Sequence, residues 1–469
     1  MVRQLGNENR PKLVSLFAGA GGLDLGLELA GFEAVAVNEL EPYACDSLRA
    51  NRLLPSLDSS EYEAWFKKQL GQRCYKNVFA PDVEPLEQRV AGAIGQFPFL
   101  RCAEILEGDI RTISSETIKT AANVIVGGLD LVAGGAPCQP FSRAGKRESV
   151  NVQTGQLFRE FVRVVNDLRP RWFLFENVKG LILTKTEIVR ASCPACRQDT
   201  LLSFDDRLLY YDGDLTARCS SCGGPSSPYA KMKAGGSLDI ILHEFEAIGY
   251  RCHNTILNAA DYGVPQLRER LIIVGSRDNE AFSWPEATNS NPAWNYRTPL
   301  FAGTELQAPW ITMRKALWSD GHPKYGYLRP DTAVLWVKNV VRPHDEPVTW
   351  SLDRPAPTIG AHQSAKLAIA PHGVPDEQLK RQQWHVLGKR QGDFPPVEVE
   401  HTYLSDADLL ALQSFPKYWY LHGTRMQRAF QIGNAVPVEL GRHLGLALFA
   451  ACKGTPSTSA FASLNCACA

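Results

Sequence analysis

Short apolar runs that stop at glycine, proline or acidic residues recur along the first 275 residues. Such runs predict buried β-strands, because each is too short for a buried helix and carries β-branched or aromatic residues. Helical periodicity lies between some of them, with Leu23, Leu27 and Ala30 on one face of a helix that Gly31 stops. Strands alternating with helices predict an α/β fold around a parallel sheet. The predicted strands are 13–17, 34–37, one near Ile105, 129–133, 172–175 and 271–275, and the predicted helices include 23–30 and 157–168.

Two stretches interrupt this pattern, and a third region follows it. Residues 52–103 show no clear period and are interpreted as an insertion. Residues 276–402 are rich in proline and tryptophan, which predicts a separate, irregular domain. At 403–452 the helical pattern returns, beginning with a capping box in which Asp408 replaces the usual Glu, three residues after Ser405. We expect this last segment to pack back on a first domain of residues 1–275, and 453–469 to be a disordered tail.

Bulk composition narrows the class of protein. The 469 residues are 44% hydrophobic and 21% charged, with a formal net charge of +0, so any surface for nucleic acid must arise from local charge segregation. No apolar run approaches a membrane span, and the first twelve residues lack a signal-peptide core. A cytoplasmic protein without membrane contact is expected, and paired cysteines among the 12 then favour metal binding over disulfides.

A glycine-rich turn joins the first strand to the first helix. Gly19, Gly21 and Gly22 let backbone N–H groups approach a ligand at the helix N-terminus. Glu39 ends the second strand 18 residues after Gly21, close to the spacing at which an acid binds ribose hydroxyls. Together they indicate a nucleoside cofactor, which could be NAD or S-adenosylmethionine.

The stretch Gly134–Ser142 carries the strongest chemical signal. Cys138 stands between Pro137 and Pro140 just after a predicted strand, where prolines fix the backbone and cannot join a sheet. Such a turn presents one side chain at the carboxyl edge of the sheet, where α/β enzymes bind ligands. The alternative is that Cys138 is a buried structural cysteine, which is common for a free thiol. The turn chemistry favours a nucleophile.

Five blocks in order resemble the C5-cytosine DNA methyltransferases. Together they span most of the chain, and the Pro-Cys block is the most specific of them. The blocks are 17–22 (FAGAGG), 137–142 (PCQPFS), 176–178 (ENV), 266–270 (QLRER) and 433–437 (GNAVP). The resemblance implies a Rossmann-like methyltransferase domain that uses S-adenosylmethionine and a smaller target-recognition domain in 276–402.

The resemblance also assigns catalytic roles. The Cys138 thiolate would add to C6 of a cytosine rotated out of the duplex, which makes C5 nucleophilic. Glu176 would donate a hydrogen bond to N3, the alternative being a structural cap before Gly180. Arg270 would contact the target base, and Arg268 would fix a phosphate or the catalytic loop; two solvated strand-edge charges are the alternative.

For the cofactor, the family pattern places Phe17 against adenine, Glu39 on the ribose and Asp109, followed by Ile110, near the exocyclic amine. Gly19, Gly21, Gly22 and Pro137 would surround the rest of the molecule. Asn434 and Val436 would complete the pocket from the C-terminal segment.

Two departures from the family pattern occur. The polar loop 142–156 is expected to close over the substrate, but residues 152–155 read Val-Gln-Thr-Gly where the family usually has Asp-x-Arg-Gly. Thr402 stands where an arginine is usual. These departures bear on phosphate and interdomain contacts and leave the nucleophile in place.

Two Cys-x-x-Cys knuckles, Cys193/Cys196 and Cys219/Cys222, lie within 183–236. Four thiolates at this spacing fit tetrahedral zinc in a zinc-ribbon-like insert, which the resemblance does not predict. A redox dithiol is the alternative, although no thioredoxin-like βαβ context surrounds either knuckle. The insert could clamp DNA or brace the fold.

Residues 297–342 hold the local basic surface that the neutral total conceals. Seven cations (Arg297, Arg314, Lys315, Lys324, Arg329, Lys338 and Arg342) outnumber three acids (Glu305, Asp320 and Asp331). Such an aromatic and basic region could bind protein or DNA. The family-like block 354–358 that follows it favours DNA recognition.

The expected function is sequence-specific DNA cytosine-5 methylation in a restriction–modification system. The expected partners are double-stranded DNA and a cognate restriction endonuclease that acts separately, and the protein is expected to be a monomer. A tRNA cytosine-5 methyltransferase and a non-catalytic DNA-binding regulator are the alternatives. The size of 276–402 counts against the first, and intact Cys138, Glu176, Arg270 and Asn434 count against the second.

Overall fold

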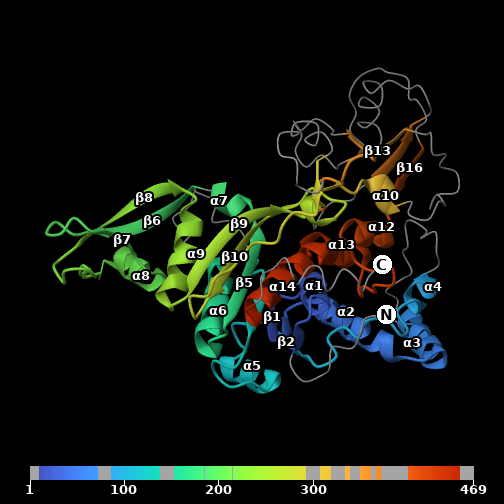
Figure 1. Ribbon diagram of the computed structural model, residues 1–469, viewed down its shortest axis with the longest axis horizontal. Coiled ribbons are helices and arrows are strands. Elements are labelled where there is room, and N and C mark those ends of the chain that lie inside the picture. Colours follow the sequence, from blue (N-terminus) through green and yellow to red (C-terminus); the bar gives the residue numbers. More distant parts are fainter. Residues whose placement is uncertain are drawn as a thin grey trace.

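A central body carries a narrow arm on one side and an upper lobe on the other (Figure 1). The computed structural model describes ten stretches of the chain, and all structural statements below concern them. They are residues 10–71, 86–137, 153–183, 185–213, 215–291, 307–317, 333–337, 349–360, 366–370 and 400–454. Cys138, most of the loop 142–156 and the tail from 455 onward lie outside them.

A seven-stranded sheet in the order β3-β2-β1-β4-β5-β10-β9 forms the centre of the body. The first five strands in this order run parallel, and β10 is antiparallel to both β5 and β9. The predicted mixed α/β fold with a large parallel sheet is therefore confirmed. The strands are β1 (Lys12–Leu16), β2 (Glu33–Glu39), β3 (Glu104–Glu107), β4 (Leu131–Gly134), β5 (Trp172–Val178), β9 (Arg251–Asn258) and β10 (Glu269–Ser276).

Helices cover both faces of this sheet. One core joins Leu23 and Leu444 to the strands on one face, and the other places Ile118, Phe161 and Phe245 on the opposite face. Both faces are thus dry, which explains why the strands read as continuous apolar runs. The helices of the first face include α1 (Gly22–Leu29), α2 (Pro42–Leu53) and α14 (Val438–Lys453), and those of the second are α5 (Ser115–Ala122), α6 (Gln153–Leu168) and α9 (Gly236–Ala247).

The C-terminal helix α14 packs directly against α1. A Cβ added at Gly26 would lie 2.6 Å from the backbone nitrogen of Arg442, and one at Gly445 would lie 2.6 Å from Cβ of Ala30. Glycine is needed at these points because the two backbones approach too closely for a side chain. Residues more than 400 positions apart therefore build one layer of the body.

One described stretch, Arg425–Lys453, is long and apolar enough to resemble a membrane span, with a mean hydropathy of 1.2. It consists of α13 (Arg425–Asn434) and α14, separated at Ala435–Pro437. The protein interior buries 72% of the most apolar window, as expected of core helices.

The insertion at 52–103 contains more regular structure than its sequence indicated. Trp65 and Phe66 of its longest helix pack in a small cluster with Tyr420, the rings of Trp65 and Tyr420 lying 5.1 Å apart. The elements are η1 (Leu54–Ser56), α3 (Ser59–Gly71) and α4 (Leu86–Ala91).

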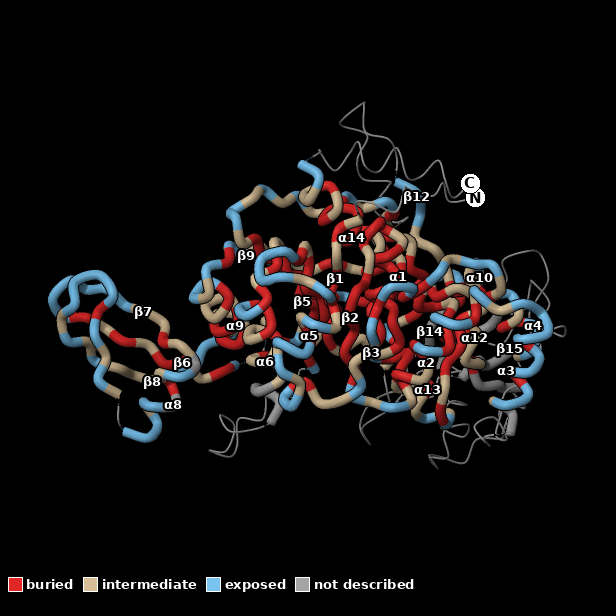
Figure 2. The backbone as a smooth tube through the Cα atoms, turned by 90° about the horizontal axis from the view of Figure 1, so that it is seen from below, coloured by how far each residue is buried: buried red, intermediate tan, exposed pale blue. Residues whose placement is uncertain are grey.

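The arm, residues 185–234, projects from the body beside α9 (Figure 2). A three-stranded antiparallel sheet in the order β7-β6-β8 packs on a helix through its own small core of Val189, Ala191 and Leu202. Its elements follow the short α7 (Gly180–Leu183) and are β6 (Lys185–Ser192), β7 (Asp199–Leu201), α8 (Phe204–Asp212) and β8 (Ser227–Ala234).

The upper lobe contains a four-stranded antiparallel sheet in the order β14-β13-β15-β16. A purely irregular domain was therefore the wrong expectation for 276–402. The capping box at Ser405 and Asp408 is confirmed, because each side chain accepts from the other's backbone N–H. The elements from β9 onward are η2 (Ala259–Tyr262), β11 (Asn289–Ser290), β12 (Ala308–Pro309), α10 (Met313–Leu317), β13 (Ala333–Val337), β14 (Thr349–Ser351), β15 (Lys366–Ala370), β16 (Glu400–Tyr403) and α12 (Asp406–Leu412).

Candidate active site

The glycine turn after β1 adopts backbone conformations that favour glycine. Gly19 and Gly21 have φ values of 56° and 78°, and Phe17 is a non-glycine residue with φ of 58°. Above the turn, a Cβ at Gly22 would lie 2.2 Å from the Val436 carbonyl oxygen. The segment between α13 and α14 therefore covers the turn, and only glycine at position 22 leaves room for the Val436 backbone.

Glu39 holds this turn from the end of β2. Its Oε2 accepts from the backbone N–H of Gly19 at 2.7 Å, and its Oε1 accepts from that of Glu41 at 2.9 Å. The side chain is buried, and burial raises the pKa of Glu39 while these N–H donors lower it. The carboxylate therefore orders the turn besides any contact with a ligand.

Asp24 lies in the first turn of α1, and the sequence interpretation missed it. It is 1% exposed, and neither carboxylate oxygen has a hydrogen-bond partner among the described residues. Desolvation raises the pKa of Asp24 to about 6, an effect that the nearby Ser15 hydroxyl only partly offsets. No sequence motif signals it, since a helix-start acid is usually a solvated N-terminal charge.

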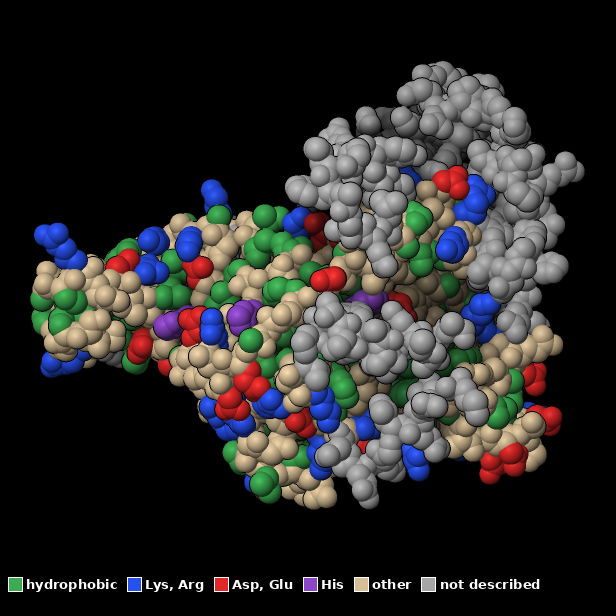
Figure 3. Space-filling model, in the orientation of Figure 1, with side chains coloured by type: hydrophobic (Ala, Val, Ile, Leu, Met, Phe, Trp, Pro, Cys, Tyr) green, Lys and Arg blue, Asp and Glu red, His purple; other side chains and the backbone are tan. Residues whose placement is uncertain are grey.

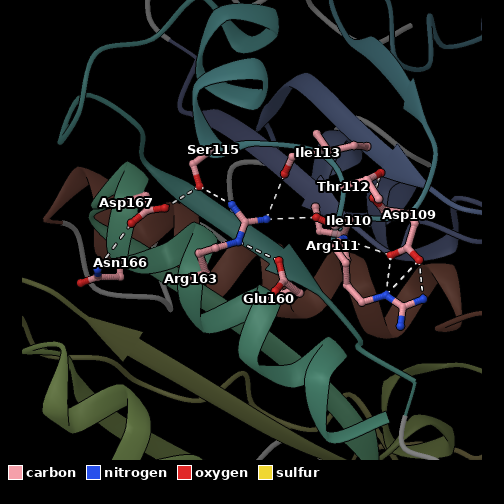
Figure 4. A network of polar contacts seen from close by, with 10 residues as sticks. All are labelled: Asp109, Ile110, Arg111, Thr112, Ile113, Ser115, Glu160, Arg163, Asn166 and Asp167. Atoms are coloured by element: carbon pink, nitrogen blue, oxygen red, sulfur yellow. Dashed lines mark hydrogen bonds and ion pairs between the residues drawn. The ribbon is translucent and has the colours of Figure 1, made fainter. Parts of the chain in front are cut away.

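The turn after β3 presents Asp109 and Ile110. Asp109 accepts from Nε of Arg111 at 2.9 Å, which lowers the pKa of its carboxyl group. Arg163 of α6 fixes the same turn by donating to the carbonyls of Ile110 and Ile113, each at 3.0 Å, and to Oγ of Ser115 at 2.6 Å (Figure 4). Arg163 is a second residue that sequence reasoning missed.

The strand end that leads to Cys138 lies against the end of β5. A Cβ at Gly135 would lie 2.7 Å from Oε2 and 3.1 Å from the backbone oxygen of Glu176, so a side chain at this position would displace the Glu176 carboxylate. Asn177 donates from Nδ2 to the Ala136 carbonyl at 3.1 Å. Pro137 is exposed, and Cys138, the next residue, lies outside the described part of the chain.

Glu176 and Arg270 form an ion pair at this edge. Nε of Arg270 lies 2.8 Å from Oε1 of Glu176, with side-chain exposures of 10% and 11%. Antiparallel pairing of β10 with β5 sets Arg270 opposite Val178 and Ile272 opposite Glu176. This register fixes how far along the two strands Arg270 and Glu176 lie from each other. Two predicted catalytic residues from separate blocks therefore meet beside the Gly135 turn.

Arg268 is buried behind the edge that carries Arg270. It is 1% exposed, and its two terminal nitrogens donate to the carbonyls of Ile359 at 3.1 Å and Gly433 at 3.0 Å. Burial lowers the pKa of this guanidinium. Arg268 thus ties the 354–359 block to the 433–437 block, and this burial does not favour the expected phosphate contact. The expected contact with the catalytic loop stays a prediction, because most of that loop lies outside the described residues.

The two residues of the C-terminal block differ in exposure. Asn434 ends α13 and is exposed, whereas Val436 is 8% exposed and covers Gly22 with its carbonyl. The structure thus brings this block over the glycine turn.

The two Cys-x-x-Cys knuckles converge at the tip of the arm. All four sulfur atoms lie within 4.8 Å of one another, and the pairs Cys193–Cys222 and Cys196–Cys219 are 3.5 and 3.4 Å apart. Backbone N–H groups lower the pKa of Cys219 to about 6. The short distances run between the knuckles, which fits one four-thiolate metal site better than two separate dithiols.

Comparison with known proteins agrees with this arrangement. The family profile for C-5 cytosine-specific DNA methylase matches residues 11–70, 97–204 and 229–450. Type II methyltransferase M.AquIA of Picosynechococcus is 31% identical over 308 residues, which cover 65% of this chain and 87% of that protein. M.BspRI of Lysinibacillus sphaericus is 28% identical over 456 residues, which cover 94% and 82%. A structure of Dnmt2 methyltransferase from S. pombe aligns over 94% of this chain and 98% of its own with 13% identity and a TM-score of 0.46.

A glycine turn and an acid at adjacent carboxyl ends of a parallel sheet define an α/β enzyme of the nucleoside-cofactor class. The chain belongs to the C-5 cytosine-specific DNA methylase family, whose members are DNA cytosine-5 methyltransferases. The two internal segments that the profile leaves unmatched, 71–96 and 205–228, fall within the stretches that the sequence pattern marked as insertions.

Proposed function

We propose that the protein is a sequence-specific DNA cytosine-5 methyltransferase that works through a covalent bond between Cys138 and C6 of a flipped-out cytosine. The observation that carries this proposal is the buried Glu176–Arg270 pair beside the turn that leads to Pro137 and Cys138. The curated relatives are named as Type II methyltransferases, which supports a restriction–modification system with a separate endonuclease.

The proposed reaction has three steps. The Cys138 thiolate bonds to C6 while Glu176 supplies a proton or a strong hydrogen bond to N3, leaving a nucleophilic C5. C5 would then take the methyl group as the methyl–sulfur bond of the donor breaks and leaves its electron pair on sulfur. A base removes the C5 proton, the C6–S bond breaks to return the thiolate, and a proton held on N3 returns to Glu176. Arg270 would orient the base and, through its ion pair, the Glu176 carboxyl group.

The residues present fit S-adenosylmethionine, which supplies an electrophilic methyl group on sulfur. Glu39 would accept from the ribose hydroxyls while keeping the Gly19 turn in place, and Asp109 would accept from the exocyclic amine. The half-buried Phe17 ring would lie against adenine. Gly19, Gly21, Gly22, Ile110, Pro137, Asn434 and Val436 would form the remaining wall.

We further propose that Cys193, Cys196, Cys219 and Cys222 bind one structural Zn²⁺. The convergence of four sulfurs within 4.8 Å supports this assignment. The arm has only a small core of its own, so a metal would contribute much of its stability.

The proposed division of labour places catalysis in 1–275 together with 403–452 and target recognition in 276–402. The packing of α14 on α1 supports a discontinuous catalytic domain. The separate antiparallel sheet of the lobe supports a second domain with its own role.

A trapped covalent adduct tests the mechanism. Fluorine at C5 cannot leave as a proton does, so a duplex with 5-fluorocytosine in the target site should remain bonded to the protein in a denaturing gel. Mass spectrometry should locate the bond at Cys138. Cys138→Ala should give no adduct and no methyl transfer while still binding cofactor.

The same preparation should be offered duplex DNA and tRNA with labelled cofactor. Label in duplex DNA supports the proposal, and label in tRNA alone would replace it with the RNA-methylating alternative. An adduct on another residue, or full turnover by Cys138→Ala, would refute covalent catalysis by this thiol.

A further inference from the structure

The arm leaves the body next to the reacting residues. It begins at Lys185, seven residues after β5 ends at Val178, and β5 carries Glu176. In Figure 1, β8 forms the upper edge of the arm with α8 below it, and the lobe with β13 to β16 rises from the same upper side of the body. The arm and the lobe therefore flank the edge of the sheet where the candidate site lies.

Charge is divided between the two halves of this insert. Residues 185–214 contain four cations and six acids, whereas 215–238 contain Arg218, Lys231 and Lys233 and no acid. The cationic half supplies β8, which is an edge strand of the three-stranded sheet. Figure 3 shows Lys and Arg side chains along the upper edge of the arm. The net charge near zero thus hides a basic edge on the same upper side of the molecule as the lobe (Figure 3).

The side chains on this edge remain available to an anion. Lys231 and Lys233 are exposed and, two residues apart on a strand, point to the same side. Lys231 lies over the Tyr229 ring at 5.7 Å, and Lys233 pairs with Asp239 while its side chain stays 47% exposed. An exposed ion pair of this kind contributes little, so a phosphate can compete for the lysine.

The length of the arm matches DNA beyond a short recognition site. Strand β8 has eight residues, which span about 26 Å at roughly 3.3 Å per residue. This length equals about eight base pairs at roughly 3.4 Å each. The family profile leaves 205–228 unmatched and resumes at 229, so Arg218 lies in the unmatched part and Lys231 and Lys233 lie in the matched part.

We propose that the β8 edge of the arm binds the phosphate backbone of duplex DNA beside the methylated site, outside the recognised sequence. This inference rests on the DNA substrate proposed above. Lys231 and Lys233 of β8, and Arg218 of the neighbouring cysteine knuckle, would make sequence-independent phosphate contacts. Such contacts add affinity and hold the enzyme on the duplex without selecting bases. Zinc at the tip would keep the strands that carry them rigid.

The test compares two duplex lengths with one recognition site. A short duplex carries the site and about four flanking base pairs on each side, and a long one carries about fifteen, which exceeds the reach estimated from the strand rise. The variant is Lys231→Ala/Lys233→Ala, and the matched control is Lys67→Ala/Lys68→Ala on α3, where both lysines are exposed. Binding is measured against salt concentration, and methylation is measured on both duplexes.

On the long duplex, the arm variant should lower the slope of log K against log salt by about two, near 0.9 for each lost phosphate contact. Its binding and methylation on the short duplex, its zinc content and its thermal midpoint should match wild type, and the α3 control should change nothing. An unchanged slope on the long duplex, as expected if the edge binds a protein instead, would overturn the proposal. Equal losses on both lengths would also overturn it. Failure of the wild type to methylate either duplex would instead refute the proposed function.

Discussion

At the scale of single residues, Asp24 is a destabilising buried acid near the glycine turn. The buried carboxylate loses its hydration, and the nearby Ser15 hydroxyl and a backbone N–H compensate for only part of that loss. Proteins keep such groups when a function requires them or when another packing solution is unavailable. The raised pKa of Asp24, about 6, expresses this cost as a preference for the neutral acid.

Asp24→Asn should therefore stabilise the protein at alkaline pH and not at acidic pH. At a pH below the ordinary pKa of 3.8, Asp24 is protonated in both the folded and the unfolded state. Its ionisation then makes no contribution to the free energy of unfolding. Between 3.8 and about 6 the unfolded state releases the proton first, and wild-type stability falls as the pH rises. Above 6 the cost is constant at about 3 kcal/mol, using about 1.4 kcal/mol per pKa unit as an upper estimate.

Urea unfolding of wild type and variant between about pH 4.5 and 8 measures the difference in free energy of unfolding. This range spans the folded-state pKa of about 6, where the linkage to proton binding changes that difference. The gain from Asn should grow with pH and level off. A gain that is the same at every pH would show that Asp24 does not titrate as described, and Asp58→Asn, a change at an exposed acid, provides the control.

Residue chemistry explains which site members the sequence could predict. Glu39 follows a strand and a glycine turn at the spacing of a ribose-binding acid, so the residues alone predicted it. Glu176 ends an apolar run, and its proposed role came from the family resemblance. For Arg268, the family resemblance implied a contact with a phosphate or with the catalytic loop. In the folded protein the backbone of 356–359 lies against this arginine and its neighbour, since Leu267 donates to the Ala356 carbonyl and Arg268 to that of Ile359.

At the scale of elements, the turn between β3 and α5 depends on a helix from the next part of the chain. Arg163 of α6 receives no sequence signal, because it reads as one of several charges on an amphipathic helix. Its contacts to the Ile110 and Ile113 carbonyls nevertheless set the path of the turn that presents Asp109. It is a positioning residue rather than a catalytic one.

Arg163→Ala should raise KM for the methyl donor with kcat changed by less than about twofold. Loss of two hydrogen bonds to carbonyls should destabilise the ordered turn by roughly 1.5 kcal/mol. This free energy corresponds to about a tenfold loss of affinity for the methyl donor. Steady-state kinetics at varied cofactor concentration and direct calorimetric binding check this split. Arg159→Ala, one turn earlier on α6 and paired with Asp205, should leave both constants unchanged. An equal effect of the two variants, or a fall in kcat alone, would contradict the assigned role.

Elements were predictable where burial is two-sided. Six strands of the central sheet fall within a few residues of the predicted bounds, and the buried runs among them are apolar because helices cover both faces. The edge strand β9, which is mostly half-buried or exposed, was not predicted. The helices α3 and α4 and the sheet of the lobe were not predicted. Their apolar residues are sparse, and Trp65 packs on Tyr420, a partner that no local pattern shows.

At the scale of the whole molecule, the arm and the body have separate hydrophobic cores. Val189, Ala191 and Leu202 belong to the arm alone, whereas the body has two large cores on the faces of the sheet. The arm should therefore lose its structure independently of the body when its metal is removed.

Metal analysis should find about one zinc per chain, the stoichiometry of a four-thiolate site. Chelation should abolish hydrogen-exchange protection in β6 and β8 while the urea midpoint of the body remains unchanged. Cys196→Ser should reproduce the chelated state, and Cys102→Ser, a change at another exposed thiol, should retain the metal. Zinc retained by Cys196→Ser, or collapse of the body upon chelation, would contradict a separate metal-stabilised arm.

The contact of the Val436 backbone with Gly22 joins two segments that the ribosome makes at different times. The glycine turn is synthesised early, and Val436 follows more than 400 residues later. At roughly 5–20 residues per second, this interval lasts about 20 to 90 seconds. A nascent chain therefore has an uncovered glycine turn through most of translation, and the proposed cofactor site is complete only after α14 has packed on α1.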